Sequence, residues 1–270
     1  MSSPRTLSSF RCPLITGASS GLGLEYARQL APHVSTLILV ARRDELLTKI
    51  AQDLTQLHPH LKVKTLPCDL STTDGRNHLI NALSEGELYP DLLLNNAGMG
   101  DYGEFSTSDW VKIEQMMTLN MQALTHLTHA LLPGLTAQSG AVLNVSSLAS
   151  VLPIPDFAVY AATKAYVTNF SEALRLELRD HKVSVLAVCP GPVKTGFGNI
   201  ALRGKASELP VKEAFYVTAE QVVTDSLKAL LKDRARIYPG LKVAITGTAL
   251  SLLPICAIRL IMSTRPRQSE

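Results

Sequence analysis

Short apolar runs recur along the chain and alternate with longer segments in which apolar residues follow a helical period. Runs rich in Val, Leu and Ile, bounded by polar or turn residues, predict buried strands. The predicted strands are 11–16, 36–41, 62–67, 91–95, 140–146, 182–188 and 235–238. The predicted helices between them are 21–31, 44–57, 72–84, 108–132, 157–180 and 218–232.

This alternation predicts an α/β fold. Strands that are apolar along their whole length are typical of a parallel sheet covered by helices on both faces. The chain has 270 residues, with no internal repeat and no low-complexity linker. We therefore expect a single domain over residues 1–270, built as a doubly wound, Rossmann-type sheet of about seven strands.

The segment 192–217 follows a predicted strand and has no strong helical period. Ligands of open α/β sheets bind at the carboxyl ends of the strands, so this segment is predicted to be a substrate lid. Its large apolar side chains indicate an apolar substrate: Phe197, Ile200, Leu202, Leu209, Val211, Phe215 and Tyr216.

We expect 240–262 to form an apolar helical extension, and the most apolar run of the chain, 243–258, lies within it. This run is shorter than a membrane span needs, and Pro254 interrupts it. The first interpretation is a buried helix pair or a contact between subunits. The alternative is a segment that rests on a membrane surface, helped by Arg259, Arg265 and Arg267.

The composition excludes several classes of protein. Hydrophobic residues make up 46% and charged residues 18%, which is unlike a disordered chain. The net charge of +3 comes without a basic block, so nucleic acid is not an expected partner. The first residues lack a signal-peptide pattern, and the four cysteines lie too far apart for a metal or redox motif. We expect a cytoplasmic protein without a metal site.

A glycine-rich turn, "TGASSGLG", follows the first predicted strand and precedes the first helix. Gly17, Gly21 and Gly23 would let the backbone turn tightly and approach a pyrophosphate at the helix N-terminus. Ser19 and Ser20 can add hydroxyl donors. Such a triplet is a weak signal alone, but its position between a strand and a helix strengthens it.

The end of the second strand indicates which dinucleotide would bind. An acidic residue is expected there when the ribose 2′-hydroxyl is bound, but this chain has Ala41 followed by Arg42 and Arg43. Guanidinium groups suit a 2′-phosphate, so the predicted cofactor is NADP(H). Arg42 is the first choice, whereas Arg43 would share the phosphate or be solvated.

Tyr160 and Lys164 are four residues apart, which places them on one face of a predicted helix. A phenol ordinarily has a pKa near ~10, and a nearby ammonium would lower it toward the working pH of a general acid. Taken alone, the pair is equally consistent with a packed aromatic and a solvated amine. Ser147, at the end of the fifth strand, would stabilise charge on a substrate oxygen.

Four motifs in order identify a family resemblance. Gly17-x-x-x-Gly21-x-Gly23, "NNAG" at 95–98, Tyr160-x-x-x-Lys164 and "PGPVKT" at 190–195 together resemble the short-chain dehydrogenase/reductase family. The resemblance spans residues 12 to about 195, and the tail is similar to that of the hydroxysteroid and 3-oxoacyl reductase branch. It implies one Rossmann-type domain, a nicotinamide dinucleotide and interconversion of alcohols and carbonyls.

The resemblance also implies roles for the catalytic residues. Tyr160 would be the proton donor, and Lys164 would bind the nicotinamide ribose and lower the phenol pKa. Ser147 would hold the substrate oxygen, and Asn120 would support a water leading to the lysine. Ser146 is the competing serine: alternation along a strand points the two serines to opposite faces, and the spacing that the family shows favours Ser147.

For the cofactor, the resemblance implies that Asp69 meets the adenine and Asn96 lines the adenosine ribose. Val193 and Thr195 would hold the nicotinamide carboxamide. The expected cofactor-binding residues are Gly17, Ser19, Ser20, Gly21, Leu22, Gly23, Arg42, Arg43, Asp69, Leu70, Asn96, Gly98, Tyr160, Lys164, Val193 and Thr195.

The expected function is therefore NADPH-dependent, reversible reduction of a small hydrophobic ketone. Two alternatives stay open: an NADP(H)-binding redox sensor or scaffold without turnover, and an NAD-linked alcohol dehydrogenase. The tail lacks the Asp-Gly-Gly turn with which many family members build a tetramer, so a homodimer is preferred. Dimers in this family pair long helices, here those near 108–132 and 157–180.

Overall fold

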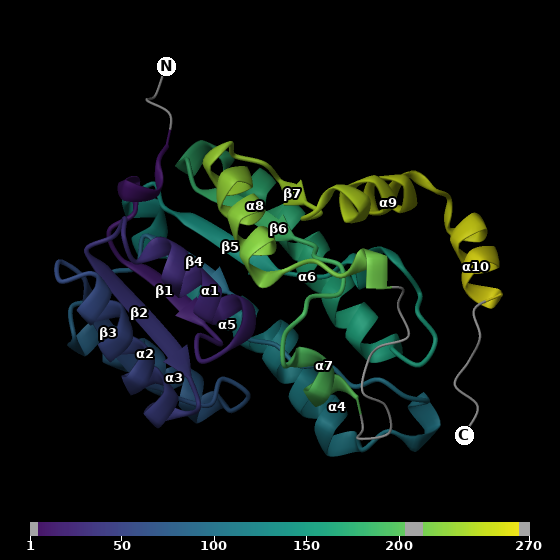
Figure 1. Ribbon diagram of the computed structural model, residues 1–270, viewed down its shortest axis with the longest axis horizontal. Helices are drawn as coiled ribbons and strands as arrows, with labels where there is room; N and C mark the ends of the chain where they lie inside the picture. Colours follow the sequence, from purple (N-terminus) through teal and green to yellow (C-terminus); the bar gives the residue numbers. More distant parts are fainter. Residues whose placement is uncertain (1–4, 203–212, 265–270) are drawn as a thin grey trace.

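The computed structural model describes residues 5–202 and 213–264, and a seven-stranded parallel sheet lies at its centre (Figure 1). The strand order is β3-β2-β1-β4-β5-β6-β7. The strands are β1 (Pro13–Thr16), β2 (Thr36–Ala41), β3 (Lys62–Pro67), β4 (Leu92–Asn95), β5 (Ala141–Val145), β6 (Ser184–Val188) and β7 (Arg236–Ile237). The doubly wound, Rossmann-type fold expected from the sequence is confirmed.

Helices cover both faces of this sheet. One face carries α1 (Gly21–Leu30), α2 (Asp44–Leu57) and α8 (Ala219–Leu231). The other carries α3 (Thr73–Glu85), α5 (Leu124–Ala137) and α6 (Ala158–Glu177). Shorter elements complete the path: η1 (Leu7–Ser9), η2 (Phe105–Thr107), α4 (Trp110–Met117), η3 (Thr118–Ala123), η4 (Leu148–Val151), η5 (Arg179–His181), α7 (Phe197–Ala201) and η6 (Glu213–Phe215).

The strands are continuously apolar because each lies between two cores. Leu14 and Ile15 are neighbours on β1, both fully buried, yet they belong to the cores on opposite faces of the sheet. The chain order reverses at β1, which has β2 on one side and β4 on the other. Such a switch point leaves a crevice at the carboxyl ends of the strands, where ligands bind in this class of fold.

The helix predicted at 108–132 is longer and less regular in the structure. It consists of α4, a π-helical stretch η3 and α5, which continues to Ala137. The helix continues past Pro133, although proline donates no backbone hydrogen bond. Leu135, beyond it, is fully buried against the sheet.

The C-terminal extension forms α9 (Leu241–Leu252) and α10 (Ile255–Ser263), separated by Pro254. The two helices extend away from the sheet, and α10 lies at one end of the long axis of the molecule (Figure 1). Their burial within the chain, one of the expected arrangements, is wrong, because only Val243, Gly247 and Ile258 are buried. None of the described helices is long and apolar enough to cross a membrane.

The predicted lid is only partly described. It contains the short helix α7, which the sequence did not predict, and the 3-10 turn η6. Leu209 and Val211 lie outside the described residues, as does the side chain of Ile200.

Candidate active site

Ser147 and Tyr160 come together at the carboxyl end of β5. Ser147 follows this strand and caps η4, where its hydroxyl accepts a hydrogen bond from the backbone N–H of Ala149 at 3.1 Å. Tyr160 lies in the first turns of α6, where its phenol is close enough to the Ser147 hydroxyl for that group to lower the phenol pKa. The structure thus brings together the two side chains predicted to hold a substrate oxygen.

Lys164 lies one turn further along α6 and is buried. Its ammonium donates to the carbonyl of Val145 at 2.9 Å and lies 5.7 Å from the centre of the Tyr160 ring. Burial lowers the pKa of Lys164 to about 8, because the charged form loses its hydration.

The expected lowering of the phenol pKa is wrong for the polypeptide by itself. Burial raises the pKa of Tyr160 to about 12, and the nearby Ser147 hydroxyl offsets only part of this effect. Desolvation dominates because the ring is enclosed, while the ammonium of Lys164 is directed to the backbone of β5.

Asn120 lies in the π-helical stretch η3 and ties three segments together. Its amide oxygen accepts from the N–H of Met99 at 3.0 Å, and its amide nitrogen donates to the carbonyl of Met99 at 2.9 Å. The same nitrogen donates to the hydroxyl of Thr163 at 3.0 Å, and that hydroxyl donates to the carbonyl of Tyr160. The amide is thus occupied in fixing the β4 loop against α6, and the predicted water relay stays a prediction.

Gly98 lies in the narrow space between Asn120 and Lys164. A Cβ at this position would be 3.1 Å from the amide oxygen of Asn120 and 3.4 Å from Nζ of Lys164. Any side chain here would therefore press on both groups, which explains why a glycine is needed.

Ser146, the competing serine, and the nearby Cys189 are core residues. The hydroxyl of Ser146 donates to the carbonyl of Lys164 at 2.8 Å and lies 2.6 Å from the Thr168 hydroxyl, on the opposite side of β5 from Ser147. Cys189 is fully buried 3.7 Å from Thr168, and burial raises the pKa of its thiol. Neither residue reaches the Tyr160 hydroxyl site.

The glycine turn has the geometry of a phosphate cradle. Gly17 and Gly21 adopt positive φ angles of 66° and 55°, which residues with a Cβ adopt rarely. A Cβ on Gly23 would lie 2.2 Å from the carbonyl oxygen of Gly17, so α1 can pack closely on β1 only with glycine there. The Ser20 side chain does not cap α1, which leaves the first N–H groups of this helix to an anion.

Asn96 and Thr16 brace this turn from the neighbouring strand. The amide of Asn96 donates to the carbonyls of Thr16 and Gly17 at 2.9 and 3.3 Å. The hydroxyl of Thr16 accepts from the N–H groups of Asn96 and Ala97, both at 3.0 Å. Sequence reasoning missed Thr16; a polar residue that ends an apolar strand was the available signal. The contact of Asn96 with a ribose stays a prediction.

The arginines lie where a 2′-phosphate was expected, and Arg43 is the one tied to the glycine turn. Its guanidinium donates to the hydroxyl of Ser19 at 3.1 Å, while Arg42 is exposed beside it. At the end of β3 the carboxylate of Asp69 accepts from the N–H and hydroxyl of Ser71 at 2.9 and 2.7 Å. Leu70, the next residue, is buried.

The segment after β6 reaches the glycine turn from the other side. A Cβ on Gly21 would lie 3.5 Å from Cβ of Thr195. Val193 pairs with Val217 in an isolated parallel bridge, which holds this segment in place. Leu22 packs partly buried against the core below the turn.

An aromatic wall encloses Tyr160. Phe157 stacks on the Tyr160 ring with centroids 4.2 Å apart, and Phe197 of α7 is tilted against it at 5.7 Å. Tyr102 contacts Phe157 edge-on at 5.5 Å, and its N–H donates to the carbonyl of Ala201. Sequence reasoning missed Phe157 and Tyr102, since nothing local to them shows that α7 folds back over α6.

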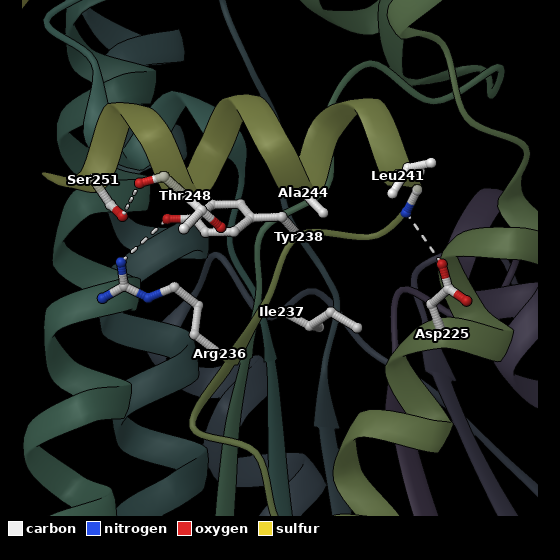
Figure 2. Close-up of a pocket in the computed structure, with 9 residues that line it drawn as sticks. Asp225, Arg236, Ile237, Tyr238, Leu241, Ala244, Thr248 and Ser251 are labelled. Atoms are coloured by element: carbon white, nitrogen blue, oxygen red, sulfur yellow. Dashed lines mark hydrogen bonds between the residues drawn. The ribbon is translucent and has the colours of Figure 1, made fainter. Parts of the chain in front are cut away.

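A separate open cavity of about 570 Å³ lies beneath α9 (Figure 2). Its charged side chains are already paired. Arg236 bonds Glu172 at 2.9–3.0 Å, and the carboxylate of Asp225 accepts from the N–H of Gly240 at 3.1 Å. Tyr160 is not among its lining residues, so it is distinct from the candidate active site.

This fold and this arrangement of residues define a Rossmann-type α/β protein with a Ser–Tyr–Lys site at the carboxyl ends of the strands. The family model of short chain dehydrogenases matches residues 11–203, and the chain belongs to this family. The resemblance inferred from the sequence motifs is confirmed.

Two of the similar curated proteins have 3-oxoacyl-CoA reductase in their names. The chain is 35% identical over 192 residues to a very-long-chain 3-oxoacyl-CoA reductase-like protein of Arabidopsis thaliana, covering 67% of this chain and 59% of that protein. It is 30% identical over 247 residues to the very-long-chain 3-oxoacyl-CoA reductase of Homo sapiens, covering 89% of this chain and 75% of that protein.

Solved structures include two close in architecture. A short-chain dehydrogenase from Sphingobium yanoikuyae in complex with NADPH has a TM-score of 0.80 and 31% identity, covering 96% of this chain and 98% of that one. A bulky-bulky ketone specific alcohol dehydrogenase from Comamonas testosteroni has a TM-score of 0.76 and 26% identity, with 96% of each chain covered.

Proposed function

We propose that the protein is an NADPH-dependent oxidoreductase that reversibly reduces an apolar ketone to the alcohol. The observation that carries the proposal is the proximity of the Ser147 and Tyr160 side chains, with Lys164 one turn away and an aromatic wall around the phenol. Relatives named as 3-oxoacyl-CoA reductases and a structure in complex with NADPH support the reaction class and the cofactor.

The residues present fit NADP(H). The positive φ angles of Gly17 and Gly21 and the open start of α1 would hold the pyrophosphate. Arg43, fixed by Ser19, would bind the 2′-phosphate together with Arg42. When bound, NADP(H) supplies or accepts the hydride.

The protein would supply orientation and the proton. The hydroxyls of Ser147 and Tyr160 would both donate to the ketone oxygen and stabilise the negative charge that develops on it. With a pKa of about 12, Tyr160 holds its proton at neutral pH and can donate it to that oxygen, which completes the alcohol. The phenolate that remains would be stabilised by Ser147 and by the ammonium of Lys164.

Tyr160 would then recover a proton from solvent. We assign this relay to Lys164, whose pKa of about 8 lets it exchange protons near neutral pH, and to a water held near Asn120. Asn120 would contribute by fixing the β4 loop on Thr163, which keeps Lys164 and Gly98 in register.

The aromatic wall defines the substrate class. Tyr102, Phe157, Phe197, Met116 and Ile154 belong to one apolar cluster that also contains Tyr160. A polar substrate would lose hydration here without gaining partners, whereas an apolar ketone would bury its surface. The segment 192–217, through Phe197, would act as the lid, and the name of the Comamonas testosteroni neighbour agrees with a bulky ketone.

We further propose a cytoplasmic homo-oligomer, with a dimer preferred through α5 and α6. Tyr166 of α6 is exposed, stacks on Phe170 and bonds Thr125 of α5 at 2.8 Å. This preformed aromatic surface on the two long helices suits pairing with a second copy.

The proposed function is tested by measuring NADPH oxidation with steroid, 3-oxoacyl and small aromatic ketones. Turnover of apolar ketones is the expected result. Turnover confined to small polar sugars would overturn the substrate class. Tight NADPH binding without turnover of any carbonyl would favour a sensor or scaffold, and equal use of NADH would favour the NAD-linked alternative.

A further inference from the structure

One exposed apolar surface lies at the corner between α9 and α10. We call it the arm patch, and it consists of side chains that are 40–80% exposed: Leu252, Leu253, Ile255, Leu260 and Ile261. The first three flank Pro254, where α9 ends and α10 begins. Soluble domains rarely expose contiguous aliphatic surface of this kind without a partner.

The described residues of α9 and α10 carry two charged side chains, and both are cationic. They are Lys242 and Arg259. Arg259 is exposed on α10 next to Leu260, so a partner surface should be apolar at its centre and acidic at its edge.

A second exposed apolar surface has this complementary character. We call it the α4 patch, and its apolar members are Phe105, Trp110 and Val111, which are 56–63% exposed. Asp109 and Glu114 are exposed carboxylates beside them. Glu114 is four residues after Trp110 on α4, so the two side chains lie on one face of the helix.

We propose that the arm patch of one copy of this protein docks on the α4 patch of a second copy. Aliphatic side chains would pack on Trp110 and Phe105, and Arg259 would face Glu114. Within one chain both patches are exposed, so they do not cover each other. Because every copy carries both patches, two chains can exchange arms reciprocally within one twofold-symmetric dimer, which would be the same dimer that is proposed to pair α5 and α6.

A membrane surface explains less of the structure. Anionic lipids would attract the cationic arm, but they would repel Asp109 and Glu114 and leave the α4 patch exposed. A second copy accounts for both patches. It would also brace the substrate site, because Met116 of α4 is buried in the same apolar cluster as Tyr160.

A cross-link between two different chains tests the contact directly. Cys256 is an exposed thiol on α10, and Gln115 is exposed on α4, one turn from Val111. A tagged chain with native Cys256 is mixed with an untagged chain carrying Cys256→Ser and Gln115→Cys, and a short bismaleimide is added. A covalent tagged–untagged dimer on a denaturing gel is expected. The matched control is the untagged Cys256→Ser chain without Gln115→Cys, which should not form it.

Two cross-linking results would overturn the proposal. The first is the same yield of covalent dimer with the control chain. The second concerns a single chain that carries both Cys256 and Gln115→Cys. If its product is internally cross-linked and no dimer forms at any protein concentration, the arm docks on its own chain.

A charge exchange tests the same contact without a cross-linker. Arg259→Glu and Glu114→Arg should each weaken the arm-dependent association by about two- to fivefold in analytical ultracentrifugation, and the double variant should recover it. Trp110→Ser should weaken it about tenfold or more. Unchanged NADPH binding in each variant serves as the control for folding. If none of the four variants changes the association, and the wild type cosediments with phosphatidylglycerol vesicles, the arm binds a membrane instead.

Discussion

The Ser147 hydroxyl lies beside the Tyr160 phenol and partly offsets the rise in its pKa, although the two residues belong to different elements, a turn after β5 and the start of α6. Their proximity depends on the way α6 packs against β5, where Lys164 donates to the carbonyl of Val145. The proposed proton donor, the neighbouring serine and the buried lysine are therefore fixed by one helix–strand contact. The following predictions test that arrangement.

Tyr160→Phe removes the proposed acid and leaves the ring packed on Phe157. Ketone reduction should fall by about 10²–10⁴-fold, the usual contribution of a positioned general acid. NADPH affinity, measured by fluorescence titration, should stay within about twofold, because an interaction confined to the transition state leaves ligand binding unchanged. Tyr166→Phe on the exposed face of α6 is the matched control. Retained activity in Tyr160→Phe would show that another group supplies the proton.

Arg43→Ala removes the guanidinium that is held by Ser19. The dissociation constant of NADPH should rise by about tenfold or more, since a hydrogen bond to a charged group contributes roughly 1.5–3 kcal/mol. NADH, which lacks the 2′-phosphate, should bind almost unchanged. Arg42→Ala should show the same preference. Isothermal titration of both nucleotides measures this, and equal losses for NADPH and NADH would rule out a 2′-phosphate site.

The pH dependence should reflect Lys164. Burial lowers its pKa to about 8, so the side chain is an ammonium below that pH and a neutral amine above it. The ammonium is the form that stabilises the Tyr160 phenolate, and kcat/KM for reduction should therefore fall as the pH rises through about 8. In Lys164→Arg, this limb should move to higher pH, because guanidinium keeps its proton. A profile that stays flat through pH 9 in the wild type would contradict the assignment.

Gly23→Ala places a methyl group against the carbonyl of Gly17, where only 2.2 Å is available. The free energy of unfolding should fall by about 1–3 kcal/mol, as for other overpacked sites. NADPH binding should weaken as well, since the turn shifts with α1. Gly134→Ala on α5, where a Cβ meets no atom within 4 Å, is the control and should be neutral or slightly stabilising. Urea denaturation with and without NADPH separates the two effects.

The sequence predicted those features that local pattern determines. All seven strands appear within about two residues of their expected bounds, because a strand buried on both faces must be apolar throughout. The glycine turn could be predicted equally well, because Gly17, Gly21 and Gly23 each meet a local requirement of the backbone.

Features that depend on tertiary packing could not be predicted in this way. Phe157 and Phe197 meet around Tyr160 only because α7 folds back over α6, and that enclosure raises the phenol pKa against the expected direction. The hydrogen bond from Arg43 to Ser19 joins two turns, and neither local sequence predicts this contact. The sequence could not decide between burial of α9 and α10 within the chain and the alternatives that leave them exposed, because an apolar composition does not reveal what covers it.

The π-helical stretch η3 changes the rotation of α5 relative to α4 about the helix axis. The two helices contact different parts of the protein. On its N-terminal side, Met116 of α4 packs in the apolar cluster of the aromatic wall. On its C-terminal side, Thr128 of α5 accepts a hydrogen bond from Asn95 inside the sheet core at 3.0 Å. Deleting one residue from 118–123 would restore an ordinary turn and rotate one helix relative to the other by about 100°. Either the contact of Met116 with the aromatic wall or that of Thr128 in the sheet core would then be lost. The length of this stretch is therefore as constrained as its chemistry.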